Sequence, residues 1–309
     1  MSKINSLQNF EYKEKCIELH RNRKKYRQFE NLTKDSLNLF LRIGDSISIS
    51  PQIIGSWEPV VASFLKFSAS KGYSDFLIDI GANVGLTSCQ SGRFFKEVHM
   101  FEPNPYCFKI LEVNSFFSLS QIKYRLYKFG LGDKNKKVKL MVPKKNWGGA
   151  FIHDRSNSYS DKILAKKDGF QRIDKKNYYN AQITIKETSQ ELKKIFMAIN
   201  KKKGKAGIIK IDVEGYENVI LKGIAEAMHE NLKIIIIFEN HDPNFSIKKC
   251  ESLFKGKAQL FKIETNYPSW ERFSRSFKYL SRLFNKEAIH HLRVADHINA
   301  KEDLVLVIE

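Results

Sequence analysis

Short apolar runs that end in polar residues or glycine recur along most of the chain. Five of these runs are predicted to be strands buried on both faces of a sheet: Phe76–Ile80, Glu97–Phe101, Tyr124–Phe129, Ile208–Val213 and Lys233–Phe238. Apolar residues at helical spacing lie between the runs, as in 60–67 and 219–224. Two later runs, Ala258–Ile263 and Asp303–Ile308, are the sixth and seventh predicted strands. The alternation predicts an α/β domain whose mostly parallel sheet carries helices on both faces.

A glycine turn follows the first of these strands directly, in the run Gly81-Ala82-Asn83-Val84-Gly85. A strand, a glycine turn and a helix N-terminus together hold nucleotide-like ligands at the edge of a parallel sheet. We expect Gly81 and Gly85 to let the backbone approach the ligand, because a Cβ would block it. The spacing differs from the dinucleotide motif G-x-G-x-x-G, since Asn83 stands in place of the second glycine.

Other strands also end in polar residues, at the edge where open α/β sheets bind their ligands. Glu102 follows the second strand, about 20 residues past the glycine turn, and a carboxylate there suits a ribose diol because it accepts both hydroxyl protons. Pro103 and Pro105 end this strand and start the next helix. The fourth and fifth strands lead into a further polar group: Asp212, Glu214, Glu239, Asn240 and His241.

The charge of the chain is unusual, although its composition otherwise is not. An apolar fraction of 42% and a charged fraction of 28% are typical of globular proteins. The net charge of +19 and the pI of about 9.6 predict an acidic partner, which is nucleic acid, anionic lipid or a charged glycan. A lysine-rich genome-wide composition explains the same charge without any partner.

Cys16, Cys89, Cys107 and Cys250 lie far apart and form no C-x-x-C pair. This spacing argues against a zinc knuckle or a disulfide framework and favours a reducing compartment. The run MSKINSLQNFEYKEK at the start lacks the apolar core of a signal peptide. The longest apolar run, Ile234–Phe238, is too short to span a bilayer. We therefore predict a cytoplasmic protein.

Three stretches stand outside the regular alternation. Residues 1–50 carry a basic cluster and are predicted to form a helical N-terminal extension, either solvated or docked to an acidic partner, ahead of the domain at 51–309. Residues 143–182 are polar, and we expect a functional or disordered loop. The insert 266–300 has aromatic and basic residues at helical spacing. This pattern predicts an amphipathic helix. The helix either packs on the core or borders the ligand site, where it would face a membrane surface or a partner.

Several stretches together resemble the FkbM-type methyltransferases, which use S-adenosylmethionine. They are Ile78–Gly85, with the spacing D-x-G-x-x-x-G, then Phe101–Asn104, Gly130–Asp133 and Ile209–Glu217, with Trp57–Pro59 and Glu239–His241 also similar. The resemblance covers the chain from about residue 50 onward. It implies a Rossmann-like class I methyltransferase fold with seven strands, the seventh antiparallel. It also implies O-methylation, with sugar hydroxyls of surface glycans or related metabolites as acceptors.

Donor binding is assigned by the same resemblance to the strand ends. The acid of the first motif and the loop amides hold the methionine end of S-adenosylmethionine, and the turn at Gly130–Asp133 flanks the adenine. The predicted donor-binding residues are Asp79, Gly81, Ala82, Asn83, Gly85, Glu102, Pro103, Asn104, Leu131, Asp133 and Asp212. For Asp133, a contact with the adenine amine and a plain turn position both stay open.

Methyl transfer to an alcohol requires a base, because a neutral hydroxyl is a poor nucleophile. The candidates lie at the ends of the fourth and fifth strands: Asp212, Glu214, Glu239 and His241. Histidine changes its charge near neutral pH, so His241 suits the task, with Glu214 orienting it or acting directly. A second interpretation is a magnesium site, because Asp212, Glu239 and Asn240 are similar to the ligand layout of catechol-type O-methyltransferases. The first interpretation assigns no metal.

Two other functions fit parts of the sequence. The positive charge is compatible with an RNA ribose 2′-O-methyltransferase. A protein with the same fold but no catalytic activity is the other alternative, and it would bind a glycan. Methylation of nucleobase amino groups fits less well. Those enzymes carry an Asp/Asn-Pro-Pro-aromatic turn, whereas this turn is Asp212-Val213-Glu214-Gly215. We therefore expect a sugar O-methyltransferase that meets an anionic or lipid-linked acceptor at the inner face of the membrane.

Overall fold

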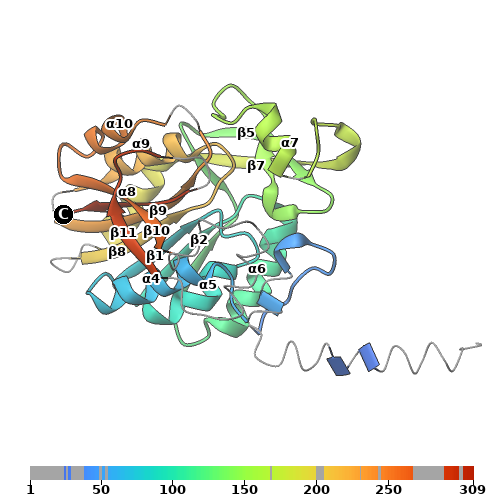
Figure 1. Cartoon of the computed structure of the whole chain (residues 1–309), viewed down its shortest axis with the longest axis horizontal. Coiled ribbons are helices and arrows are strands. Elements are labelled where there is room, and N and C mark those ends of the chain that lie inside the picture. Colours follow the sequence, from blue (N-terminus) through green and yellow to red (C-terminus); the bar gives the residue numbers. More distant parts are fainter. Residues whose placement is uncertain are drawn as a thin grey trace, which may run out of the picture.

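Eight strands form one sheet at the centre of the protein (Figure 1). In spatial order they are β3 (Lys123–Tyr127), β2 (Glu97–Phe101), β1 (Phe76–Ile80), β8 (Lys205–Ile211), β9 (Leu232–Asn240), β12 (Glu302–Ile308), β10 (Ala258–Asn266) and β11 (Ile289–Val294). The structure is a computed structural model that describes residues 24–25, 27–28, 38–48, 51–52, 55–167, 169–199, 205–229, 231–242, 245–266, 289–298 and 302–309.

The strand directions confirm the predicted fold class. Strands β3, β2, β1, β8 and β9 are parallel, and β12 runs antiparallel between β9 and β10. The chain runs outward from β1 to β2 and β3, then returns to β8 on the other side of β1. Ligands of open α/β sheets bind beside the carboxyl ends of the strands at such a reversal.

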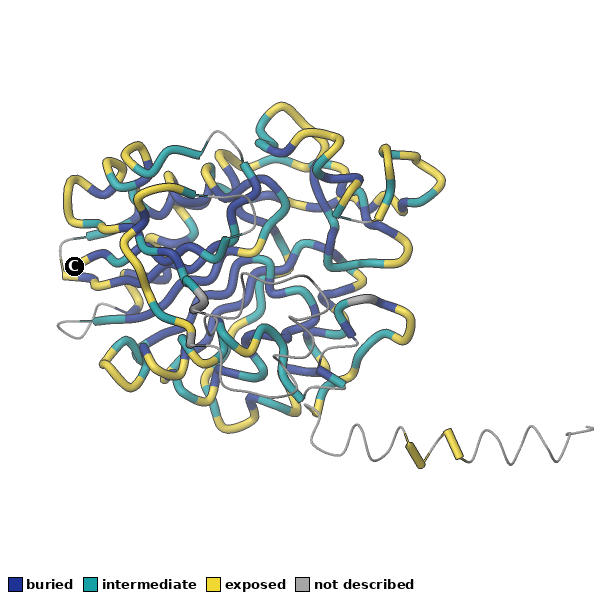
Figure 2. Tube along the Cα trace, viewed as in Figure 1, coloured by how far each residue is buried: buried dark blue, intermediate teal, exposed yellow. Residues whose placement is uncertain are grey.

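Helices cover both faces of this sheet (Figure 1). They are α4 (Pro59–Ser70), α5 (Leu86–Ser91) and α6 (Pro105–Ser118) on one face, and α8 (Thr188–Ile199) and α9 (Glu217–Ala227) on the other, with α10 (Ile247–Ser252) leading into β10. Successive strand residues point to opposite faces. Leu77 accordingly packs in the cluster of Leu65, whereas Ile78 packs in the cluster of Phe196 and Ile220. All five residues of β1 are buried (Figure 2).

β11 is an eighth strand that the sequence pattern does not predict. The predicted helical insert at 266–300 is wrong for Ile289–Val294, which pair antiparallel with Phe261–Asn266. Without β11, the N–H and C=O groups along one side of β10 would stay unpaired, and this pairing satisfies them. The residues that suggested a helix lie outside the described part of the chain: Trp270, Phe273, Phe277, Leu280 and Phe284, with Arg275, Lys278 and Arg282.

A second sheet has four strands in the order β4 (Gly130–Gly132), β7 (Tyr178–Glu187), β5 (Lys136–Pro143) and β6 (Phe151–Ile152). β5 pairs antiparallel with β7 and not with β3, the strand that precedes it in the main sheet. The expected turn at 130–133 is largely the strand β4, which is parallel to β7. Apolar residues on one face of this sheet, such as Leu140 and Ile183, join the core that contains Phe101.

The segment 143–182 is more ordered than the expected loop. It contains η3 (Trp147–Gly149), β6, α7 (Asp161–Lys167), η4 (Lys175–Asn177) and the start of β7. Its own small core joins Phe151, Tyr159, Leu164 and Tyr178. Of the predicted N-terminal extension, residues 24, 25, 27 and 28 are helical and exposed, and most of the remainder lies outside the described residues.

Candidate active site

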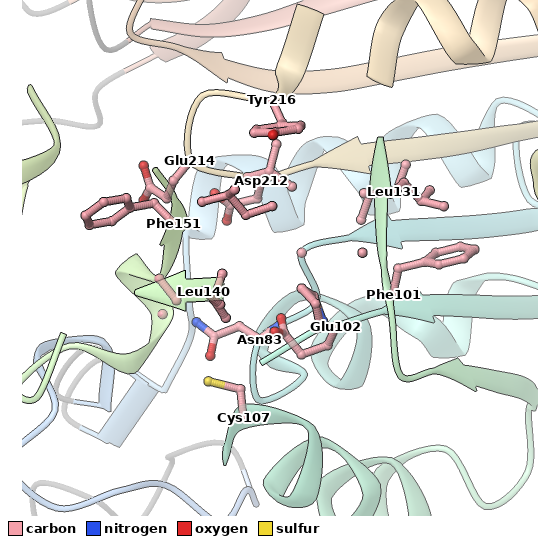
Figure 3. A pocket seen from close by; sticks show the side chains of 18 of the residues that line it. Asn83, Phe101, Glu102, Cys107, Leu131, Leu140, Phe151, Asp212, Glu214 and Tyr216 are labelled. Atoms are coloured by element: carbon pink, nitrogen blue, oxygen red, sulfur yellow. The ribbon is translucent and has the colours of Figure 1, made fainter. Parts of the chain in front are cut away.

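A cavity lies where the carboxyl ends of β1, β2 and β8 meet the second sheet (Figure 3). Glu102 and Asn83 lie together on one side, and Asp212 and Tyr216 lie on the other. Among the predicted donor-binding residues, the cavity is lined by Gly81, Asn83, Glu102, Pro103, Leu131 and Asp212. The others, which do not line it, are Asp79, Ala82, Gly85, Asn104 and Asp133.

Both glycines of the first motif are required by contacts within the protein. Gly81 has φ 88°, and a Cβ there would lie 1.9 Å from the backbone oxygen of Asp212. Gly85 has φ 92°, and its Cβ would lie 2.9 Å from atoms of Cys89 and Leu111. The positive φ favours glycine as well. Gly81 therefore lies close to the backbone that follows β8 and also lines the cavity, and the predicted approach of a ligand to this glycine stays a prediction.

Asp79 is a buried carboxylate beneath the glycine turn. Its Oδ2 accepts a hydrogen bond of 2.7 Å from the Ser88 hydroxyl. Its Oδ1 is shielded from solvent and has no hydrogen-bond partner among the described residues. Burial raises the pKa of Asp79, and the charge of Lys210 opposes this shift. A buried acceptor without a partner fits a site whose ligand supplies the missing donor.

Glu102 is also buried, and both of its oxygens hold the turn in place. Oε2 accepts from the Asn83 amide and Oε1 from the Asn104 amide, each over 2.7 Å. Burial raises the pKa of Glu102 to about 7, with these two hydrogen bonds opposing the shift. Each carboxylate oxygen keeps a second lone pair for a hydroxyl donor.

Asn104 connects the end of β2 to η3, which covers the cavity. Its side chain caps α6 by accepting from the Tyr106 amide and donates to the Trp147 carbonyl over 3.0 Å. The Trp147 amide in turn donates to Asp45 over 3.1 Å. Sequence reasoning missed Asp45, which is a buried acid.

The residues of Gly130–Asp133, which were predicted to flank the adenine, lie in two different environments. Leu131 is buried and lines the cavity, whereas Asp133 is half-exposed and lies 3.3 Å from the Lys136 ammonium. Tyr216 lines the cavity close by, and its hydroxyl donates to Asp154 over 2.7 Å.

Lys210 is the second residue that sequence reasoning missed. It is buried within β8, its ammonium donates to Asp212 over 2.7 Å, and it lies 3.8 Å from Glu58. Burial tends to lower the pKa of Lys210. The charges of Asp212, Glu58 and Asp79 outweigh burial and raise this pKa. Burial works against ionisation of Asp212 too, but the Lys210 charge lowers the pKa of this carboxyl. A lysine inside the apolar run Ile208–Ile211 was the available signal, since a charge in a buried strand needs a partner.

The predicted catalytic residues beyond Asp212 form a salt-bridged group next to the cavity. His241 is buried, with its Nε2 3.0 Å from Glu239, and Lys167 of α7 lies 2.7 Å from Glu214 and 3.9 Å from Glu239. Burial raises the pKa of Glu214, opposed by Lys167. Despite burial, His241 and Lys167 lower the pKa of Glu239. Glu214 lines the cavity described above. Glu239 lines a narrow neighbouring cleft, and Asp212 lines both this cleft and the cavity.

The comparisons with known proteins agree with this geometry. The family model described as "Methyltransferase FkbM domain" matches residues 79–280. The chain belongs to the FkbM methyltransferase family. Methyltransferase sdnD of Sordaria araneosa is 23% identical over 202 residues, which make up 63% of this chain and 76% of that protein. The family match and this relative confirm the resemblance drawn from the motifs.

Solved structures are similar to this FkbM methyltransferase only at a distance. An O-methyltransferase from Bacillus cereus in complex with SAH has 10% identity and a TM-score of 0.37, with 82% of this chain and 83% of that chain covered. A SAM-dependent methyltransferase from Agrobacterium tumefaciens has 8% identity and a TM-score of 0.39, with 83% and 64% covered. The fold class follows from the strand order and directions of the sheet itself.

The residues considered for magnesium do not fit a metal site. Both ends of the Asn240 amide are used by the backbone of Asp242, over 3.0 and 3.2 Å. Asp212 already faces the Lys210 ammonium. Within the described ranges, no group of three or more His, Cys, Asp or Glu side chains is arranged to hold a metal ion. The described helices also include none that is long and apolar enough to cross a membrane.

Proposed function

We propose that this FkbM methyltransferase transfers a methyl group from S-adenosylmethionine to a sugar hydroxyl of a surface glycan or a related metabolite. The observation that carries the proposal is the position of Asp212, which lines both the donor cavity and the neighbouring cleft. That cleft is lined by three more carboxylates, from Glu58, Glu239 and Asp303. Carboxylates accept hydrogen bonds from hydroxyl groups and take up their protons, so this small cleft suits a single hydroxyl group of an acceptor.

The donor fits the cavity by the chemistry of its lining. When bound, S-adenosylmethionine supplies an electrophilic methyl group on a sulfonium sulfur. Glu102 would hold the ribose hydroxyls through the lone pairs that its backbone partners leave free. Phe101 and Leu131 line the cavity and would offer apolar surface to the adenine, and the turn at Gly81 would lie against the methionine end. Asp133 does not line the cavity, so we leave it out of the donor site.

The cleft residues position the acceptor beside the donor. Glu239 lines the cleft, and its contacts with His241 and Lys167 outweigh burial and lower its pKa, which favours the ionised form. It therefore accepts a hydrogen bond from an acceptor hydroxyl, while His241 fixes its orientation at 3.0 Å. Lys167 reaches this group from α7, which belongs to the segment 143–182. Holding the reacting atoms in line contributes much of the rate of a methyl transfer.

The acidic cleft separates the proposal from its strongest alternative, an RNA ribose 2′-O-methyltransferase. An RNA acceptor brings phosphates, and carboxylates around the reacting hydroxyl would repel them. The net charge of +19 favours RNA, or equally an anionic or lipid-linked glycan. We propose the glycan, methylated in the cytoplasm at the inner face of the membrane. A non-catalytic glycan-binding protein has the weaker case, because the first motif is intact.

Incubation with methyl-labelled S-adenosylmethionine tests the proposal. The protein is offered fractionated surface polysaccharide and total RNA in parallel, and label is counted in each fraction. We expect label in the polysaccharide, as a methyl ether that survives mild base. Label in ribose of the RNA would replace the proposal with the alternative. Absence of label in both fractions, with donor binding intact, would favour the glycan-binding protein.

A further inference from the structure

Glu58 has a backbone conformation that is unusual for its residue type. It immediately precedes Pro59, the first residue of α4, and has φ 40° and ψ 65°. The left-handed region costs a non-glycine residue on the order of 1–2 kcal/mol, and such residues cluster at functional sites. Its side chain makes no capping hydrogen bond to α4. The Glu58 carbonyl accepts the first hydrogen bond of α4, from the Ala62 amide over 2.9 Å, so it is the side chain that is left for another role.

The carboxylate of Glu58 lies in the acidic cleft. Its Oε2 is shielded from solvent, has no hydrogen-bond partner among the described residues, and lies 3.8 Å from the Lys210 ammonium. The side chain as a whole is 37% exposed, so one part of it faces the cleft opening. The groups around it are Lys210 and Asp212 of the β8 end, Glu239 of β9 and Asp303 of β12.

These surroundings give Glu58 the properties of a proton acceptor. Burial raises its pKa to about 7, Lys210 opposes the shift, and the charges of Asp212, Asp303 and Glu239 add to it. A base works best when its pKa lies near the operating pH. At neutral pH the carboxyl group is thus about half ionised, and its ionised form can take a proton.

Asp212 and Glu239 are less suited to this step because the groups around them lower their pKa values in spite of burial. Asp212 lies 2.7 Å from Lys210, and Glu214 lies 2.7 Å from Lys167. Glu239 lies 3.0 Å from His241. At Asp212 and Glu239 these contacts outweigh burial, stabilise the ionised carboxylate and weaken it as a base.

We infer that the carboxylate of Glu58 is the base that takes the proton of the acceptor hydroxyl. The inference rests on the proposed O-methyl transfer. Glu58 takes the O–H proton while the hydroxyl oxygen bonds to the methyl carbon and the electron pair of the breaking C–S bond stays on sulfur. The proton passes to water when the methylated product leaves. Asp212 and Lys210 position the acceptor side of the site and do not exchange the proton.

Glu58→Gln tests this assignment, with the polysaccharide fraction as acceptor. We expect kcat to fall about 100-fold or more, as for loss of a general base, and the affinity for S-adenosylhomocysteine to stay within about twofold. Wild-type kcat should rise with pH through about 7, and this limb should vanish in the variant. An unchanged kcat and pH profile would overturn the assignment while the proposed function stands. If the wild-type protein transfers no methyl group to the polysaccharide, both the base assignment and the proposed function are overturned.

Two further variants test whether the pH dependence of kcat comes from Glu58. Asp303→Asn removes a charge that raises the pKa of Glu58, so the limb should move to lower pH and persist. Glu58→Asp keeps a titrating carboxylate, so a pH limb should remain even if the glutamine variant folds poorly. A limb that disappears in Asp303→Asn would assign the base to Asp303 instead.

A measurement without donor or acceptor provides an independent readout. Ionised Glu58 is disfavoured in the folded protein, because its folded pKa of about 7 lies above the ordinary 4.5. Stability contributed at this position is therefore lost as pH rises from about 4.5 through about 7. Glu58→Gln should raise the Tm more at pH 8 than at pH 5. Equal shifts at both pH values would overturn the titration on which the base assignment relies.

Discussion

Lys210 donates to Asp212 over 2.7 Å, from within a buried strand to the residue two positions further along the chain. The same ammonium lies 3.8 Å from Glu58, and its charge also acts on Asp79. One buried cation thus serves carboxylates from three separate elements, at the point where donor cavity and acidic cleft adjoin.

Replacing this cation should destabilise the whole protein. Lys210→Met leaves its carboxylate partners without a counter-charge, and we expect a loss of about 3 kcal/mol in the free energy of unfolding. This is the lower end for a broken buried ion pair, since Asp212 is 43% exposed. Urea unfolding measures it. Lys109→Met removes an exposed lysine paired with Glu112 and should change stability by less than about 0.5 kcal/mol. Equal losses in both variants would contradict the central role of Lys210.

Donor affinity should depend on the ionisation of Glu102. Its pKa is raised to about 7 by burial, and the ionised form is the better acceptor for ribose hydroxyls. Calorimetry with S-adenosylhomocysteine should therefore show tighter binding at pH 8 than at pH 6. In Glu102→Gln this dependence should disappear, with binding weaker by about 1.5–3 kcal/mol at pH 8. Glu112→Gln, an exposed change on the adjoining helix α6, should behave as wild type.

Gly81 and Gly72 form a matched pair for testing the contact between the glycine turn and β8. Both have positive φ, of 88° and 101°, but a Cβ would meet the Asp212 backbone only at Gly81 and would meet nothing within 4 Å at Gly72. Gly72→Ala should cost about 1–2 kcal/mol for the left-handed backbone alone. Gly81→Ala should cost several times more and abolish donor binding, as thermal unfolding and calorimetry would show. Similar costs would mean that the turn moves easily away from β8.

His241→Ala should lower turnover and leave the donor in place. The imidazole helps to lower the pKa of Glu239 and fixes its position at 3.0 Å. We expect kcat to fall about 10–100-fold with the affinity for S-adenosylhomocysteine preserved. His153→Ala is the matched control, because His153 also pairs with a carboxylate, Asp161 at 2.8 Å, but on the exposed surface. A loss of donor affinity in His241→Ala would place this histidine in the donor site instead.

The sheet and the position of Glu102 could be predicted from the sequence because both depend on local pattern. Buried parallel strands read as apolar runs, and their carboxyl ends must meet at one edge. Glu102 and Asp212 each follow such a run directly, so their approach to one cavity is a consequence of strand order.

The second sheet and the charge cluster could not be predicted because they depend on choices among distant partners. β5 has several apolar strands within reach, and only the packing of both faces decides that β7 is its neighbour. Glu58 gains its properties from groups on β8, β9 and β12. A single sequence shows a Trp-Glu-Pro run there, but not which charges surround it.

The two sheets make separate hydrogen-bond ladders, and the donor cavity lies between them. In the described part of the chain, β4 to β7 form one contiguous stretch, 130–187, that leaves the main sheet after β3 and returns through α8. Its replacement by another stretch would leave every strand pairing of the eight-stranded sheet unchanged. Exchange of this stretch would therefore alter the wall of the cavity that contains Leu131 and the Lys167 contacts with Glu214 and Glu239, while the elements carrying Asp79, Glu102 and Lys210 keep their strand pairings.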